Sequence, residues 1–154
     1  MNKRVAEVMT ADPRTVTRQD SIVAAAKVML EEDVGSVPVA EDGYLLGIVT
    51  DRDIALRVVA AGRDPQTVQV EEVATPDPHY ASPEESLDDV YERMSIWRIR
   101  RLPVVEGDRL VGMLAQADIV HELKDKKAGH LVDEISRPGQ VPYAYGRRDV
   151  GIQS

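Results

Sequence analysis

A threonine and an aspartate three residues apart are the strongest candidates for chemistry in this sequence. Thr50 and Asp53 follow an apolar run and open a segment with helical spacing. A Thr-x-x-Asp pair can form an N-terminal capping box, in which each side chain accepts a hydrogen bond from the other residue's backbone N–H. The same hydroxyl and carboxylate, at the positive end of a helix dipole, could instead contact a bound ligand. These two residues alone leave both interpretations open.

The sequence holds a second, incomplete version of this pair. Asp118 follows a similar apolar run, but Ala115 stands where the threonine would be. Alanine has no acceptor for a capping hydrogen bond, whereas an aspartate in the first helical turn still gains from the helix dipole. Asp118 is therefore the weaker of the two candidates on sequence grounds.

The pairing of these motifs reflects an internal repeat. When Val8 is aligned with Val73, an offset of 65 residues, the two halves align without a gap up to Ile54, which aligns with Ile119. Asp-Pro pairs, a helix-capping serine, a Pro-Val pair and a glycine recur in register. A gapless register of this length predicts two copies of one supersecondary unit.

Each copy is predicted to fold as β-α-β-β-α, which makes the protein α/β (α+β). The helices are expected to begin after Asp20 or Ser21 and after Ser86, where apolar residues recur at helical spacing. The other expected elements are strands at 14–17, 37–39, 45–49, 102–105 and 110–114, helices at 51–61 and 116–126, and a short helix near 70–74. Two such units can complete a core by packing sheet to sheet with pseudo-two-fold symmetry.

The predicted boundaries follow from this repeat. The first unit spans residues 5–62, a linker spans 63–72, and the second unit spans 73–127. Residues 128–154 are rich in Gly, Pro and Arg, and are expected to form a partly disordered C-terminal tail.

Composition and motif content exclude several classes of function. The net charge of −8 argues against a nucleic-acid surface. No apolar run is long enough to span a bilayer, so we expect a cytoplasmic protein with no membrane partner. Cysteine is absent and the three histidines lack ligand spacing, so no metal is expected. The sequence shows neither a nucleophile and a general base at a recognisable spacing nor a Gly-rich phosphate loop, so we expect no enzyme activity.

The two halves resemble the tandem CBS repeat, also called the Bateman module. The resemblance rests on residues 8–13, 37–39 and 47–53 in the first copy and on residues 102–105 and 112–118 in the second. It covers about residues 5–124. It implies a regulatory module that binds an adenine nucleotide between its repeats and dimerises, and it implies no catalytic activity.

The resemblance also implies roles for particular residues. Asp53 would accept hydrogen bonds from the ribose hydroxyls, and Thr50 would face a phosphate. Arg52, on the helix that follows, is a further nucleotide-binding candidate, with surface ion pairing as the alternative. The adenine would lie against Thr10, Val37, Pro38 and Val39, and Arg100 and Arg101 would reach phosphates. A second, weaker site would use Asp118, Val104 and Thr75. For the two arginines, a solvated basic turn or an inter-subunit salt bridge is an equally open alternative.

These expectations together predict a standalone regulatory module that binds AMP, ADP or ATP in the cleft between its repeats. It would be a homodimer and would transmit ligand binding to an unidentified protein target. The alternative is a ligand-free dimeric interaction scaffold. The sequence does not separate one site per chain from two.

Overall fold

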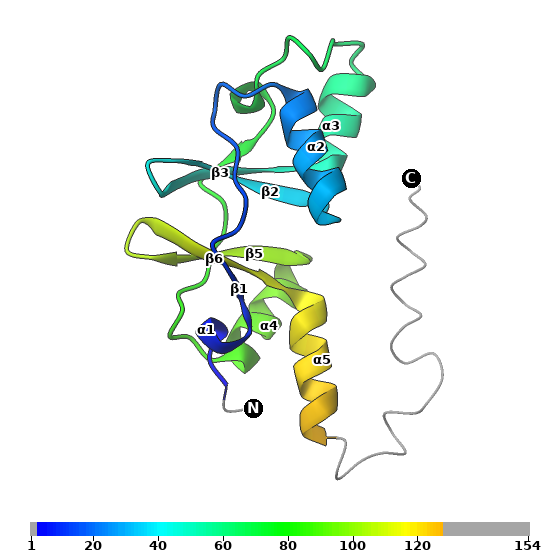
Figure 1. Ribbon diagram of the computed structural model, residues 1–154. Coiled ribbons are helices and arrows are strands. Elements are labelled where there is room, and N and C mark those ends of the chain that lie inside the picture. Colours follow the sequence, from blue (N-terminus) through cyan, green and yellow to red (C-terminus); the bar gives the residue numbers. More distant parts are fainter. Residues whose placement is uncertain (1–2, 128–154) are drawn as a thin grey trace, which may run out of the picture.

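The computed structural model describes residues 3–127, which form two similar halves facing each other (Figure 1). The first half contains the helix α2 (Ile22–Glu32), the hairpin β2 (Ser36–Glu41) and β3 (Tyr44–Thr50), and the helical stretch α3 (Asp51–Ile54) with the π-helical η1 (Ala55–Val59). The second half contains α4 (Leu87–Trp97), the hairpin β5 (Arg101–Glu106) and β6 (Arg109–Ala115), and α5 (Gln116–Lys127). The two halves confirm the predicted α/β architecture of two repeats.

Helix ends repeat between the halves, as the sequence alignment predicts. The Ser21 Oγ accepts a hydrogen bond from the Ala24 N–H at 3.1 Å, and the Ser86 Oγ accepts one from the Asp89 N–H at 3.3 Å. Each helix then ends on a residue in the left-handed conformation, Asp33 with φ 57° and Arg98 with φ 59°. These two positions are related by the 65-residue offset, so the backbone follows the repeat even where the side-chain charge is reversed.

Short strands cross from each half to the other. The strand β1 (Thr10–Ala11), which precedes the first half, pairs with β6 of the second, and β4 (Thr75–Pro76), which precedes the second half, pairs with β3 of the first. The hairpins also meet directly where Tyr44 pairs with Arg109. All six strands therefore belong to one hydrogen-bonded sheet (Figure 1).

Two separate hydrophobic cores lie on the outer faces of the sheet, and both draw on segments outside their own repeat. The short helix α1 (Val5–Val8) places Val5 in the second core, together with Leu87, Met94 and Leu114. The 3-10 helix η2 (Val70–Glu72) lies in the predicted linker, and Val68 and Val70 pack in the first core. The linker is thus part of the folded unit.

Some elements differ from those expected. The strand expected at 14–17 consists of one parallel bridge, between Val16 and Val39. The helix expected at 51–61 widens into a π-helix after Ile54, where the Ala60 N–H bonds to the Ala55 carbonyl at 2.9 Å. The expected tail at 128–154 lies outside the described residues. Within residues 3–127, no helix is long and apolar enough to cross a membrane.

An ion pair beside α4 yields a pH-dependent prediction. Glu85 accepts hydrogen bonds from Arg93 at 2.6 and 3.3 Å and from the Ser82 N–H at 2.8 Å. The Arg93 contact lowers the pKa of Glu85 below its ordinary value. A lowered pKa adds stability above the unfolded-state pKa of about 4.3, and that contribution is lost as pH falls through the folded pKa.

We therefore expect Glu85→Gln to lower the free energy of unfolding at pH 7, by less than about 1 kcal/mol for this half-exposed pair. The difference from the unsubstituted chain should shrink as pH falls below about 4.3. Urea denaturation at several pH values measures this, with the exposed neighbour Glu84 changed to Gln as the matched control. A difference that grows toward low pH would contradict the assignment.

Candidate functional site

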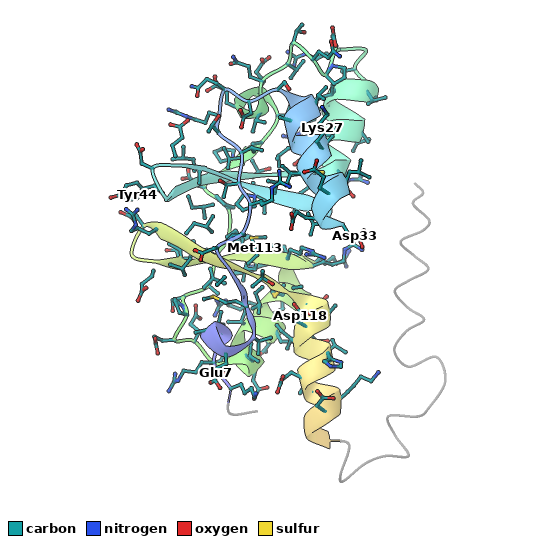
Figure 2. All side chains as sticks on the ribbon, in the orientation of Figure 1. Glu7, Lys27, Asp33, Tyr44, Met113 and Asp118 are labelled. Carbon is teal, nitrogen blue, oxygen red and sulfur yellow. The ribbon has the colours of Figure 1, made fainter. Side chains whose placement is uncertain are left out.

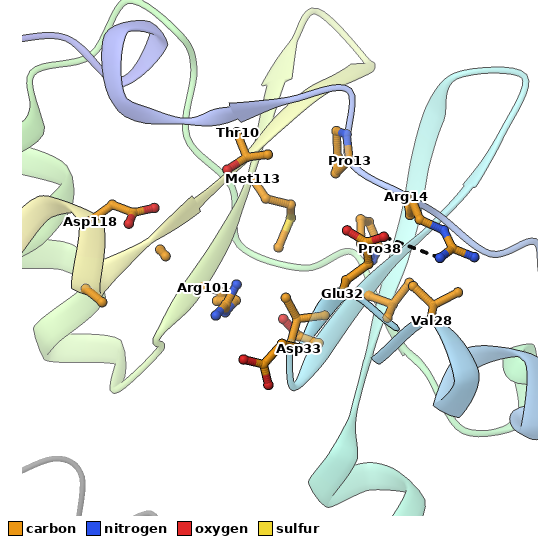
Figure 3. Close-up of a pocket in the computed structure, with 15 residues that line it drawn as sticks. Thr10, Pro13, Arg14, Val28, Glu32, Asp33, Pro38, Arg101, Met113 and Asp118 are labelled. Carbon is orange, nitrogen blue, oxygen red and sulfur yellow. Dashed lines mark hydrogen bonds and ion pairs between the residues drawn. The ribbon is translucent and has the colours of Figure 1, made fainter. Parts of the chain in front are cut away.

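A pocket opens between the two halves. It lies beside the C-terminal end of α2 and the N-terminal end of α5. Its cavity volume is about 350 Å³, within the range of small-molecule sites. Figure 3 shows that residues from both halves line it, and Figure 2 shows Asp33 and Asp118 on the same side of the molecule. The first half and the segment before α2 supply Thr10, Pro13, Arg14, Val28, Glu32, Asp33, Val34, Ser36, Val37 and Pro38. The second half supplies Arg101, Met113, Ala115, Ala117 and Asp118.

Two charged side chains in this pocket are available to a ligand. Asp118 lies in the first turn of α5, and Arg101 begins β5, so the second half presents a carboxylate and a guanidinium to the same pocket. Within the described part of the chain, neither side chain has a hydrogen bond or ion pair. A free carboxylate can accept from two neighbouring hydroxyls, and a guanidinium can bind a phosphate through two parallel hydrogen bonds.

The second arginine of the pocket is already engaged. The Arg14 guanidinium lies 2.6 Å from a Glu31 carboxylate oxygen and 3.3 Å from one of Glu32 (Figure 3 marks the contact with Glu32). The hydrogen bond to Glu31, followed by that to Glu32, raises the pKa of Arg14 above its ordinary value. Arg14 therefore remains charged, but its charge is balanced by these two carboxylates.

The remaining wall of the pocket is apolar and includes one buried hydroxyl. Pro38 on β2 and Met113 on β6 offer aliphatic surface suited to a flat heterocycle, whereas the Val37 side chain is 1% exposed and packs in the first core. The Ser36 Oγ is buried and has no hydrogen-bond partner among the described residues. A buried hydroxyl without a partner costs stability.

Thr50 and Asp53 form the capping box that their spacing predicts. The Thr50 Oγ1 accepts from the Asp53 N–H at 3.0 Å, and the Asp53 Oδ2 accepts from the Thr50 N–H at 3.0 Å. The other carboxylate oxygen of Asp53 lies 4.0 Å from the Arg57 Nε. The Thr50 hydroxyl and one carboxylate oxygen of Asp53 are therefore engaged in the helix cap, and neither residue lines the pocket described above.

The structure separates residues that the sequence grouped into one site. Thr10, Val37, Pro38 and Arg101 line the pocket, but the aspartate that joins them is Asp118. Arg52 and Arg100 are not among the lining residues. Val39 and Val104 have their side chains in the two hydrophobic cores. Thr75 pairs with Ile48 on β3, in the position that the offset relates to Thr10.

Sequence reasoning missed Asp33, Ser36 and Met113 as pocket residues. The repeat provides a signal for two of them, because the 65-residue offset relates Asp33 to Arg98 and Ser36 to Arg101, the first residue of β5. Met113 follows the glycine of the second repeat motif, and it pairs with Thr10 across the exchanged strand. The exchange of strands between halves determines which groups meet, and no local pattern encodes it.

The capping box gives a prediction for stability. Thr50→Val keeps the shape of the side chain but removes the acceptor for the Asp53 N–H. We expect unfolding free energy to fall by about 1 kcal/mol, and the melting temperature by about 2–4 °C. Thr15→Val, at an exposed threonine, is the control for thermal denaturation. Equal melting temperatures for both variants would contradict a stabilising cap.

One protein-family model matches the chain twice, once in each repeat. The family model for the CBS domain matches residues 5–60 and again residues 70–125. The chain belongs to the CBS domain family. The two matched CBS domains correspond to the two halves. The first match includes the helix α1, which packs in the second core, and the second match includes Val70, which packs in the first core, whereas Val68 lies between the two matched ranges.

Other CBS-pair proteins are similar over most of this chain. The CBS domain-containing protein YhcV of Bacillus subtilis is 41% identical over 133 residues, which cover 86% of this chain and 94% of YhcV. The structure of CBSX2 from Arabidopsis thaliana, solved in complex with AMP, is 25% identical with a TM-score of 0.71, and covers 82% of this chain and 99% of that one.

A further solved relative contains metal. Hypoxic response protein I, a Mycobacterium tuberculosis protein solved with two coordinated zinc ions, is 34% identical with a TM-score of 0.71, covering 77% of this chain and 98% of that one. In the CBS pair described here, residues 3–127 contain no group of three or more His, Asp or Glu side chains placed to hold a metal ion.

Proposed function

We propose that this CBS pair is a regulatory module, without enzymatic activity of its own, that binds an adenine nucleotide in the pocket between its repeats. The observation that carries the proposal is the Asp118 carboxylate and the Arg101 guanidinium in one pocket, each without a partner among the described residues, together with the aliphatic side chains of Pro38 and Met113. Asp118 would accept from the ribose hydroxyls and Arg101 would bind a phosphate. The AMP complex of CBSX2 supports this ligand class.

The ligand would act by contacting both repeats at once. Val37 and Pro38 belong to the first half, whereas Arg101 and Asp118 belong to the second. A ligand shifts a conformational equilibrium only by its difference in affinity for the two states. A nucleotide in this pocket would favour the arrangement in which both repeats contact it. A protein target that binds the helices would then have a different affinity for that arrangement.

The equivalent position in the other repeat is a second candidate. The 65-residue offset relates Asp118 to Asp53 and Thr10 to Thr75, so a second nucleotide would use Asp53 and Thr75, with Thr50 and Arg52 nearby. We place the first site at Asp118 because its carboxylate is free, whereas that of Asp53 is held in the capping box.

We further propose that the module is a homodimer. Leu30, Leu56, Val59 and Ile96 are more than half exposed on its helices, and burial of these side chains against a second copy would remove apolar surface from water. The competing function, a ligand-free dimeric scaffold, relies on this feature alone and requires no pocket ligand.

Native mass spectrometry of freshly purified protein tests both proposals at once. We expect the mass of two chains, and an added mass that matches AMP, ADP or ATP or appears when AMP is supplied. A dimer without any adduct, and without a thermal shift at millimolar AMP, ADP or ATP, would contradict the nucleotide proposal and favour the scaffold. A single-chain mass would contradict the homodimer.

A further inference from the structure

The pocket between the repeats has an unusual balance of charge for a nucleotide site. Its lining contains three carboxylates, from Glu32, Asp33 and Asp118, and two guanidinium groups, from Arg14 and Arg101. Arg14 is neutralised by Glu31 and Glu32. Arg101 is thus the one cation of this lining without a partner in the described part of the chain, and Asp33 and Asp118 are carboxylates without one.

The three groups without a partner within residues 3–127 line the same pocket. In Figure 3, Arg101 lies between Asp118, at the start of α5, and Asp33, at the end of α2. One phosphate can pair with Arg101 while Asp118 remains available to hydroxyl groups. A second and third phosphate would add negative charge to a pocket whose lining also holds the Asp33 carboxylate. Among the described residues, that lining has no cation besides Arg101 that lacks a partner.

We propose that this pocket selects adenosine ligands with no more than one phosphate and discriminates against ATP. The selectivity rests on the proposed nucleotide function and concerns the same site. Asp33 acts as the group that rejects a longer phosphate chain, and Arg101 acts as the group that accepts a single phosphate. The chain's net charge of −8 adds to the same repulsion.

The second repeat indicates how to test the role of Asp33. At the position related to Asp33 by the 65-residue offset, the chain has Arg98, in the same left-handed helix-ending conformation. An arginine is therefore compatible with this backbone conformation. Asp33→Arg should replace a repelling group with an attracting one without disturbing the end of α2, and Asp33→Asn should remove the repulsion alone.

The test needs a readout confined to this pocket, because nucleotides could bind elsewhere on the chain. Met113 lines the pocket, and the whole sequence has only five methionines. Methyl-¹³C-methionine labelling therefore gives a simple NMR spectrum, in which Met113→Leu assigns the Met113 signal. Titrations with adenosine, AMP and ATP, in EDTA without divalent metal, then give a dissociation constant for this pocket.

We expect AMP to bind at least tenfold more tightly than ATP in the unsubstituted chain. High salt should reduce that ratio, because screening weakens repulsion between exposed charges. Asp33→Arg should reduce it severalfold, mainly by strengthening ATP binding, and Asp33→Asn should give an intermediate ratio. Asp108→Arg, the same charge change at the remote turn between β5 and β6, should leave the ratio unchanged.

The possible failures are distinguishable. No movement of the Met113 signal with any of the three compounds would contradict nucleotide binding itself. A Met113 signal that saturates with ATP at the same or a lower concentration than with AMP would retain the proposed function and overturn the selectivity. Equal effects of Asp33→Arg and Asp108→Arg would overturn the role of Asp33.

Discussion

Replacing Asp118 with alanine should weaken AMP binding roughly tenfold to a hundredfold. The carboxylate would lose charge-assisted hydrogen bonds from the ribose hydroxyls, worth about 1.5–3 kcal/mol, and each 1.4 kcal/mol corresponds to about a factor of ten in the dissociation constant. Isothermal titration calorimetry measures the change. Because Asp118 makes no hydrogen bond within the described chain, the variant should remain folded.

The direction of this effect separates two roles for the carboxylate. If Asp118 were only a nearby negative charge, its removal would strengthen the binding of an anionic nucleotide. If it accepts hydrogen bonds from the ribose, its removal weakens binding despite the reduced repulsion. Asp125→Ala removes the same charge from the exposed surface of the same helix and serves as the control. Affinity that rises in both variants would overturn the proposed role.

Replacing Gly47 with alanine should destabilise the protein by about 1–3 kcal/mol, as expected for overpacking at a tight contact. Gly47 lies on β3 opposite Pro76, and an added Cβ would lie 2.7 Å from the backbone carbonyl oxygen of Thr75. This oxygen belongs to β4, which cannot rotate away as a side chain can. The substitution therefore has to push β4 away from β3.

Two other glycines provide a graded comparison for this prediction. An added Cβ at Gly35 meets only the Asp51 carboxylate, which can rotate away, so Gly35→Ala should cost little. At Gly112, the equivalent of Gly47, an added Cβ meets the flexible Met9 side chain and lies 3.0 Å from the Thr10 carbonyl oxygen. The loss of unfolding free energy for Gly112→Ala should therefore be intermediate. Urea denaturation measures the three values. Equal losses at Gly35 and Gly47 would contradict a backbone clash.

The sequence predicts the elements of each repeat well because their signals are local. Ser21 and Ser86 cap the helices where the apolar spacing begins, and the hairpins turn at the predicted positions. The exchanged strands β1 and β4 have only two residues each, and their pairing joins residues about 100 positions apart for Thr10 with Met113. Periodicity within a window cannot detect such contacts.

The candidate site is predicted only in part for the same reason. Four of the residues that the sequence grouped together, Thr10, Val37, Pro38 and Arg101, line one pocket. The sequence favours Asp53 over Asp118 because the Asp53 motif is complete, yet in the structure this complete motif forms a helix cap. The incomplete motif, with Ala115 in place of threonine, leaves the Asp118 carboxylate free. Which of two equivalent groups is available depends on contacts that spacing does not reveal.

The exchange of β1 and β4 has a consequence for any attempt to produce one repeat alone. A fragment cut in the linker would keep its hairpin but lose the strand that covers one side of it. The bare N–H and C=O groups of β3 or β6 would then be open to pairing with other molecules, a common route to aggregation. We therefore expect the complete tandem to stay in solution where a single repeat aggregates, because only the tandem covers these strand edges.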